Sequence, residues 1–120
     1  MRTLGLFSSA SFSAVSSSDT MSSHAGWLEG GLNNAPTYSG NRKTAAFSSA
    51  SGGSKSLSSS LAFSITGSGT VKGSFLVFGS GAAATKEDTG GVLYSAGLFS
   101  GGDKVVGNGD TLNVSYTASL

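Results

Sequence analysis

The chain has 120 residues, of which 11% are charged, with a formal net charge of +1 and no cysteine. This length corresponds to one domain with a core of its own. The lack of cysteine excludes disulfides and thiolate metal sites. Ordinary globular proteins are about 25% charged, so the low charge of this chain argues against nucleic acid as a partner. No stretch is apolar over about 18 residues, so no membrane span is predicted.

The N-terminal segment, residues 1–18, is predicted to be an arm or a first strand. Within it, Leu4 and Leu6 would share one face of a strand over Thr3–Phe7. Repeated serines between residues 8 and 13 interrupt the apolar region that a secretory signal peptide requires. We therefore expect no signal peptide, and a single β-sandwich domain over residues 19–120.

The middle of the chain alternates between loops and strands. Residues 30–42 form a predicted loop, because they are rich in glycine and asparagine and include the single proline. A short strand is predicted over Thr44–Ser48, followed by a longer one that begins near Leu57. Apolar residues of the longer strand would share one face: Leu57, Leu61, Phe63 and Ile65. Polar residues would lie on the other face: Ser58, Ser60, Ser64 and Thr66.

Gly67-Ser68-Gly69 is typical of a tight hairpin, here leading into a strand over Val71–Phe78. From Phe75 onward this strand is apolar on both faces, which indicates a central strand or one that is covered by an interface. Because aromatic and large apolar side chains often anchor interfaces, four residues are candidate interface anchors: Trp27, Tyr38, Leu76 and Phe78.

The last third of the chain begins with a glycine-rich loop over residues 79–91 that carries the densest charge, Lys86, Glu87 and Asp88. Strands are predicted over Val92–Phe99, Lys104–Val106 and residues 112–120, where apolar and polar residues alternate. About seven short strands at a spacing of about 8–12 residues predict an antiparallel β-sandwich, immunoglobulin-like or jelly-roll-like. The predicted core consists of Leu61, Phe63, Ile65, Phe75, Val77, Leu112, Val114 and Tyr116.

Residues with catalytic or metal-binding chemistry do not form a recognisable pattern. His24 is the single histidine, and we expect it to pack beside Trp27 in a loop. The glycine-rich stretches lack the spacing of a phosphate-binding loop. The acidic residues do not match a calcium loop, and we expect them to accept backbone hydrogen bonds in turns: Glu87, Asp88, Asp103 and Asp110. The sequence therefore predicts no enzyme, no cofactor and no metal.

Three segments of the chain carry a family resemblance. An acidic-Thr-Met-x-x-His-x-Gly-Trp pattern occupies Asp19–Trp27, a glycine-rich stretch occupies Gly67–Leu76, and a longer segment covers residues 90–120. Together they resemble a family of small structural proteins that tailed bacteriophages encode. The loop Gly30–Pro36 departs from the family pattern, and residues 1–18 are shorter than the arm of many relatives.

The resemblance implies a component of the virion. The first expectation is a capsid decoration (cement) protein on the capsid surface, with the major capsid protein as its partner and a homo-oligomeric state. A tail or fibre component that binds the host surface, and that contacts a tail protein, is the alternative. Low charge and apolar strand surface suit either position, because both keep much of the protein surface in contact with neighbours.

Overall fold

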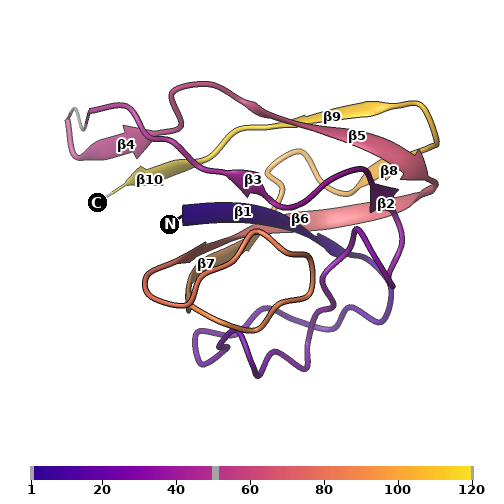
Figure 1. Cartoon of the computed structure of the whole chain (residues 1–120), viewed down its shortest axis with the longest axis horizontal. Helices are drawn as coiled ribbons and strands as arrows, with labels where there is room; N and C mark the ends of the chain where they lie inside the picture. Colours follow the sequence, from indigo (N-terminus) through magenta and orange to yellow (C-terminus); the bar gives the residue numbers. More distant parts are fainter. Residues whose placement is uncertain (1, 50–51, 120) are drawn as a thin grey trace.

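Antiparallel β-sheets packed face to face form the fold, in a computed structural model that describes residues 2–49 and 52–119 (Figure 1). No helix occurs among these residues. The predicted fold class, an antiparallel β-sandwich, is therefore confirmed.

The first sheet is built around one long strand, β6, which pairs with β1 on one side and with β7 and β8 on the other. A short strand, β3, continues the sheet beyond β1. The bounds of these strands are β1 Arg2–Ser8, β3 Lys43–Thr44, β6 Gly69–Phe78, β7 Val92–Leu98 and β8 Lys104–Val106.

The second sheet has the order β2-β5-β9 and is accompanied by the two-stranded sheet β10-β4. Its strands are β2 Thr37–Tyr38, β5 Leu61–Gly67 and β9 Thr111–Val114, together with β4 Ser54–Ser56 and β10 Thr117–Ser119. The described residues thus form ten strands rather than about seven. β2 and β4 are too short to show an alternation of apolar and polar residues. The predicted C-terminal strand is divided in two, because β9 pairs with β5 whereas β10 pairs with β4.

The predicted hairpin at Gly67-Ser68-Gly69 is wrong. β5 and β6 do not pair with each other, because the chain crosses here from the second sheet to the first. The glycines serve a close approach instead. A Cβ at Gly69 would lie 2.6 Å from the backbone nitrogen of Pro36, and one at Gly67 would lie 2.5 Å from Oγ1 of Thr37.

Strand β6 is apolar on both faces because each face is covered by a different part of the same chain. Leu76 belongs to the core between the sheets, together with Leu4 and Phe63. Phe75 and Val77 point to the opposite face, where Trp27 and the loop residues around it cover them. A bulge in the pairing of β6 with β1, where Ser8 lies opposite Val71, brings Val71 to the same face as Leu76.

The predicted core is therefore correct in content but not in arrangement. Phe75 and Val77 are buried outside the sandwich interior, whereas the interior holds the other predicted residues, fully buried or at its margin: Leu61, Phe63, Ile65, Leu112, Val114 and Tyr116. The sequence pattern assigns Phe75 and Val77 to the wrong face of β6, because the sequence alone does not reveal the bulge.

Residues Arg2–Ser8 of the N-terminal segment form a first strand, as one of the two predictions for this segment has it. β1 lies between β3 and β6, and Leu4, Leu6 and Phe7 are buried in it. The predicted boundary at residue 18 therefore divides residues that belong to one fold.

The sandwich has two unlike edges. On one, the short strands β2 and β3 belong to opposite sheets and are joined by residues 39–42, so that the chain itself links the two sheets. We call this the closed edge. On the other, β7 and β8 end the first sheet and β9 ends the second; residues 107–110 join β8 to β9, but no strand among the described residues pairs with the outer side of β7 or of β9. We call this the open edge.

Candidate functional site

The closed edge contains a buried ion pair between Arg42 and Glu29. The guanidinium donates two hydrogen bonds to the carboxylate, from Nε to Oε2 at 2.8 Å and from Nη2 to Oε1 at 2.6 Å. The side chain of Arg42 is fully buried and that of Glu29 nearly so. Such a pair is retained only where further hydrogen bonds satisfy both groups.

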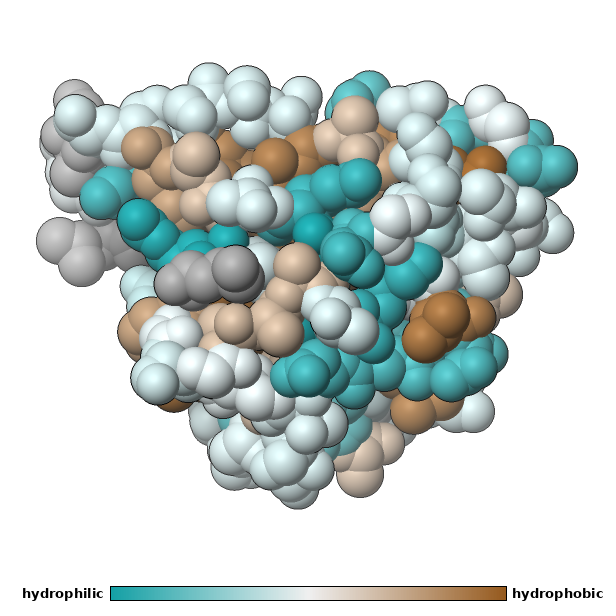
Figure 2. Space-filling view, viewed as in Figure 1, coloured by the Kyte–Doolittle hydropathy of each residue, from teal (hydrophilic) through white to brown (hydrophobic). Residues whose placement is uncertain are grey.

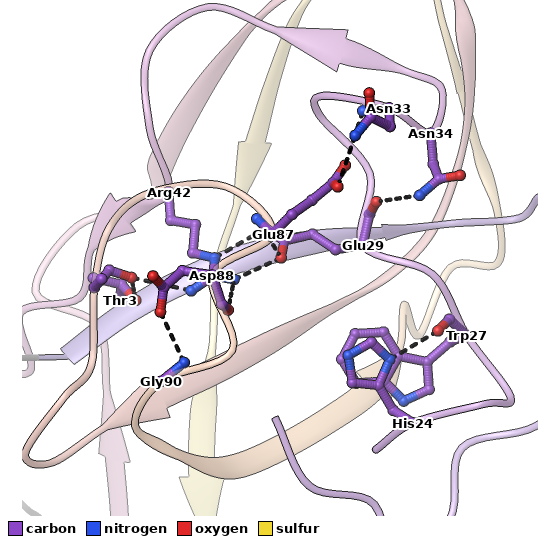
Figure 3. A network of polar contacts seen from close by, with 11 residues as sticks. Thr3, His24, Trp27, Glu29, Asn33, Asn34, Arg42, Glu87, Asp88 and Gly90 are labelled. Carbon is purple, nitrogen blue, oxygen red and sulfur yellow. Dashed lines mark hydrogen bonds and ion pairs between the residues drawn. The ribbon is translucent and has the colours of Figure 1, made fainter. Parts of the chain in front are cut away.

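Those further bonds hold the long loop over residues 79–91 against the closed edge (Figure 3). Arg42 donates to the carbonyl oxygens of Ala83 at 3.0 Å and Asp88 at 2.8 Å. The backbone nitrogen of Glu87 donates to Oε1 of Glu29 at 3.0 Å. The ion pair is therefore fully engaged in structure and does not present a free acid or base.

Lys86 completes the attachment of this loop. Its ammonium donates to the carbonyl oxygens of Gly31 at 2.9 Å and Tyr38 at 2.6 Å, and it lies 4.5 Å from the centre of the Tyr38 ring. Burial lowers the pKa of Lys86. Burial, and to a smaller extent the nearby charge of Glu29, raise the pKa of Tyr38 far above its ordinary value. Among the described residues the Tyr38 hydroxyl has no hydrogen-bond partner.

Sequence reasoning did not find this network. The sequence predicts residues 30–42 and 79–91 as two separate loops and gives no sign that they meet. No sequence signal links Glu29 to Arg42, since neither lies in a recognisable motif.

On the face shown in Figure 2, a band of hydrophilic residues separates the apolar areas on either side of it.

His24 packs against Trp27, as predicted. The two rings are stacked with centroids 3.8 Å apart and an interplanar angle of 11°. Nδ1 of His24 lies 2.9 Å from the carbonyl oxygen of Trp27, and the indole nitrogen donates to Oδ2 of Asp19 at 3.1 Å. These contacts order the loop layer over β1 and β6.

The prediction of turn carboxylates is confirmed for Asp88 and Asp110, whereas Glu87 accepts its backbone hydrogen bond from a distant loop. Backbone nitrogens donate to Glu87 from Asn33, to Asp88 from Gly90 and to Asp110 from Gly107, at 2.8, 2.7 and 2.8 Å. Asp103 instead pairs with Lys72 at 3.3 Å. Within residues 2–49 and 52–119, no group of three or more potential ligands is placed to hold a metal ion.

Three of the four candidate interface residues are core residues. Trp27, Tyr38 and Leu76 are almost completely buried, so the prediction that they anchor a partner at the surface is wrong. Tyr38 and Leu76 pack in the core between the two sheets, and Trp27 packs in the loop layer that covers the other face of the first sheet. Phe78, at the end of β6, is 37% exposed and is the one of the four that reaches the surface.

The exposed apolar side chains gather at the open edge. Of the six large hydrophobic residues that are exposed in the described chain, five lie on the end of β6 or on β7 and β8: Phe78, Val92, Tyr94, Leu98 and Val105. Val105 is the most exposed, at 82%. Val92 and Tyr94 lie on one face of β7, whereas the bulge at Tyr94 places Leu98 on the other face, so alternation in the sequence does not by itself define this surface.

A groove of about 770 Å³ runs along the open edge between β7 and the segment from β9 to β10. Beside it lies a smaller pocket of about 200 Å³, walled by four aromatic rings: Phe47, Phe78, Tyr94 and Tyr116. The hydroxyl groups of Ser95 and Tyr116, 2.8 Å apart, lie where the two hollows meet. The arrangement is suited to binding and contains no set of reactive groups.

Comparison of the chain with protein-family models, with curated proteins and with solved structures finds no match. The described residues contain no helix that would span a lipid bilayer.

Proposed function

We propose that the chain is a non-catalytic structural protein that attaches through its open edge to a repeated protein surface. The observation that carries this proposal is the concentration of exposed apolar side chains on β7, β8 and the end of β6. Exposed large apolar side chains on the strands at one sheet edge are typical of association sites, and an uncovered edge of this kind favours pairing with another chain.

The resemblance to virion proteins of tailed bacteriophages supports a specific form of the proposal. In that form the protein decorates the capsid surface, and its partner is the major capsid protein. A lattice presents many identical sites, so a modest interface of about 800 Å² per partner suffices when copies also contact one another. The low charge of the chain agrees with a working state in which much of its surface is covered.

A tail or fibre component that binds the host surface is the second candidate. It is favoured by the edge-to-face pair of Phe78 and Tyr94, whose ring centroids are 5.5 Å apart and whose rings line the small pocket. Exposed aromatic rings of this kind pack well against sugar rings.

Quantitative mass spectrometry of particles made by the genome that encodes this chain tests the proposal. We expect a copy number in proportion to that of the major capsid protein, and cryo-EM density on the shell. A copy number in proportion to the tail proteins would favour the second candidate. Absence of the chain from purified particles would overturn both.

Variants identify the attachment surface in the same experiment. We expect Val105→Lys with Leu98→Lys to remove the protein from particles without unfolding it, because both side chains are more than half exposed. Leu32→Lys is the matched control, since Leu32 is exposed to a similar degree as Leu98 but lies outside the open edge. Equal retention of both variants would contradict attachment through the open edge.

A further inference from the structure

We infer that the groove at the open edge accepts an extended, acidic segment of the partner protein, which adds a strand to β7. The inference deepens the proposed function and rests on attachment through the open edge. It specifies the shape, charge and binding mode of the partner.

The backbone of β7 is the first reason. β7 pairs with β6 along one side, and no strand among the described residues pairs with its other side. Alternate N–H and C=O groups of such an edge strand therefore point outward, which is the arrangement that an added strand recognises. β9, across the groove, likewise pairs with β5 alone.

Small side chains keep the groove open. Ser95 lies opposite Leu76, and Gly97 lies opposite Ser74, so Ser95 and Gly97 share the sheet face that points toward the second sheet. A Cβ added at Gly97 would have no atom within 4 Å. On the other wall Leu112 and Val114 line the groove. The sandwich thus lacks bulky residues on one sheet at the place where the other sheet presents them.

The charge of the groove selects an acidic partner. Lys104 lines the groove, and Arg2 and Lys55 line the adjoining aromatic pocket, whereas no carboxylate lines either. Glu29 pairs with Arg42 at the closed edge, and Asp103, which precedes β8, pairs with Lys72 and lines neither hollow. One lysine at the groove and two cations at the adjoining pocket thus face these hollows with no carboxylate in either lining, and opposite charge on the partner would complement them.

A second copy of this chain does not supply such a segment. The chain has six acidic residues, and none of them lies in a strand: Asp19, Glu29, Glu87, Asp88, Asp103 and Asp110. All six are also engaged in hydrogen bonds or ion pairs within the chain. The added strand must therefore come from a different protein.

The aromatic pocket gives the added strand its position along β7. With a volume of about 200 Å³ and walls of aromatic rings, it has room for a single large apolar side chain. Alternate residues of a strand point to the same side. An acidic segment with one aromatic or large aliphatic residue on the inward side would place that residue in the pocket.

NMR titration of the full chain with two synthetic peptides tests the inference. The first is a capped octapeptide in which glutamate alternates with valine, one central valine being replaced by phenylalanine. The second has lysine in place of every glutamate. We expect the acidic peptide to shift the amide signals of β7 and to slow hydrogen exchange of its outward amides, and the lysine peptide to bind at least tenfold more weakly.

Gly97→Leu is the decisive variant, because the new side chain would occupy the groove without a steric clash. We expect it to weaken binding of the acidic peptide at least tenfold. Gly107→Leu is its matched control, since a Cβ there meets only Oδ2 of Asp110 at 3.8 Å and lies outside the groove. Lys104→Glu should also weaken binding, whereas Lys43→Glu, which makes the same change of charge at the closed edge, should not.

Equal binding of the two peptides, shifts confined to residues outside β7 and β9, or no binding at millimolar peptide would overturn the inference. The outcome is separable from that of the proposed function. If the peptide fails but Val105→Lys with Leu98→Lys still removes the protein from particles, attachment stands and strand addition is wrong. If the peptide binds but particles lack the chain, strand addition stands and attachment to particles is wrong.

Discussion

The two edges of this sandwich differ in how they treat the backbone groups of the first sheet that lack a partner strand. An edge strand exposes backbone groups that invite pairing with another chain, and proteins normally cover or charge such edges. At the closed edge the outer side of β1 is covered by β3 and by the segment 28–30, which bonds to Leu6 and Ser8. At the open edge nothing equivalent covers β7 within the described chain.

The difference extends to charge. At the closed edge a cation and a carboxylate are buried together, and their hydrogen bonds also hold the loop over residues 79–91. At the open edge Lys104 lines the groove and no carboxylate does. The comparison indicates that the closed edge contributes stability, whereas the open edge is available for binding.

Arg42→Ala is expected to have the largest effect, because it leaves Glu29 buried without its partner. We expect a loss of about 3–5 kcal/mol in the free energy of unfolding, measured by urea denaturation. Lys104→Ala, at the open edge, should change it by no more than about 0.5 kcal/mol. A loss below about 1 kcal/mol for Arg42→Ala would contradict the structural role of the ion pair.

Phe63→Ala and Leu112→Ala compare the core near each edge. The two residues lie opposite each other on β5 and β9, but Phe63 is fully buried against Tyr38, with ring centroids 4.9 Å apart, and Leu112 is half-buried beside the groove. We expect losses of about 3–5 kcal/mol for Phe63→Ala and about 1–2 kcal/mol for Leu112→Ala, measured by thermal or urea unfolding. Equal losses would mean that the open edge is packed as tightly as the interior.

Tyr38→Phe tests the closed edge at high pH. The pKa of Tyr38 is raised in the folded protein above its ordinary value of 10.0, so the unfolded chain loses this proton first as the pH rises. Above pH 10 the folded protein should therefore lose about 1.4 kcal/mol of stability per pH unit on account of this residue.

The difference in unfolding free energy between the wild type and Tyr38→Phe isolates this contribution from that of Lys86. The phenylalanine variant should lack the extra decline between pH 10 and 11. At neutral pH it should be as stable as the wild type or more so, because the change removes a buried hydroxyl that has no partner among the described residues. A marked loss at neutral pH would show that the hydroxyl is satisfied after all.

Val105→Lys should have the smallest effect on folding. Its side chain is 82% exposed, so the free energy of unfolding should change by no more than about 0.5 kcal/mol. Self-association of the purified protein, measured by analytical ultracentrifugation, should nevertheless decrease, since the new lysine places a charge among the exposed apolar side chains of the open edge. Unchanged association would place the contact between free copies elsewhere.

Strand positions and fold class were largely predictable from the sequence, because period-two alternation of apolar residues is a local property of the chain. β5 carries that pattern throughout and β1 and β7 carry it in part, whereas β6 is apolar on both faces from Phe75 onward. Sheet pairing was not predictable. Gly67-Ser68-Gly69 has the composition of a hairpin, but its role depends on the approach of residues 35–37, which lie far away in sequence.

The same limitation explains the misplaced interface residues. Two-sided apolarity in β6 correctly indicated a strand covered on both faces, but the sequence could not show that the second cover is the loop layer with Trp27 and Met21. Nor could it show the ion pair of Glu29 and Arg42, which arises only when two loops meet. What the sequence did contain is the partial apolar alternation of β7, whose meaning depends on its place at the edge of a sheet.

The pairing of β1 with β6 also has a consequence for how the protein folds. Arg2 lies opposite Phe78, and Ser54 lies opposite Ser119, so the sheets depend on partners that are far apart along the chain. The entropy cost of closing such long loops arises before strand pairing stabilises the fold. All-β topologies of this kind therefore fold in about milliseconds to seconds. During synthesis β1 emerges before β6 and remains without its main partner until β6 has been made, and in that interval its apolar residues are open to aggregation.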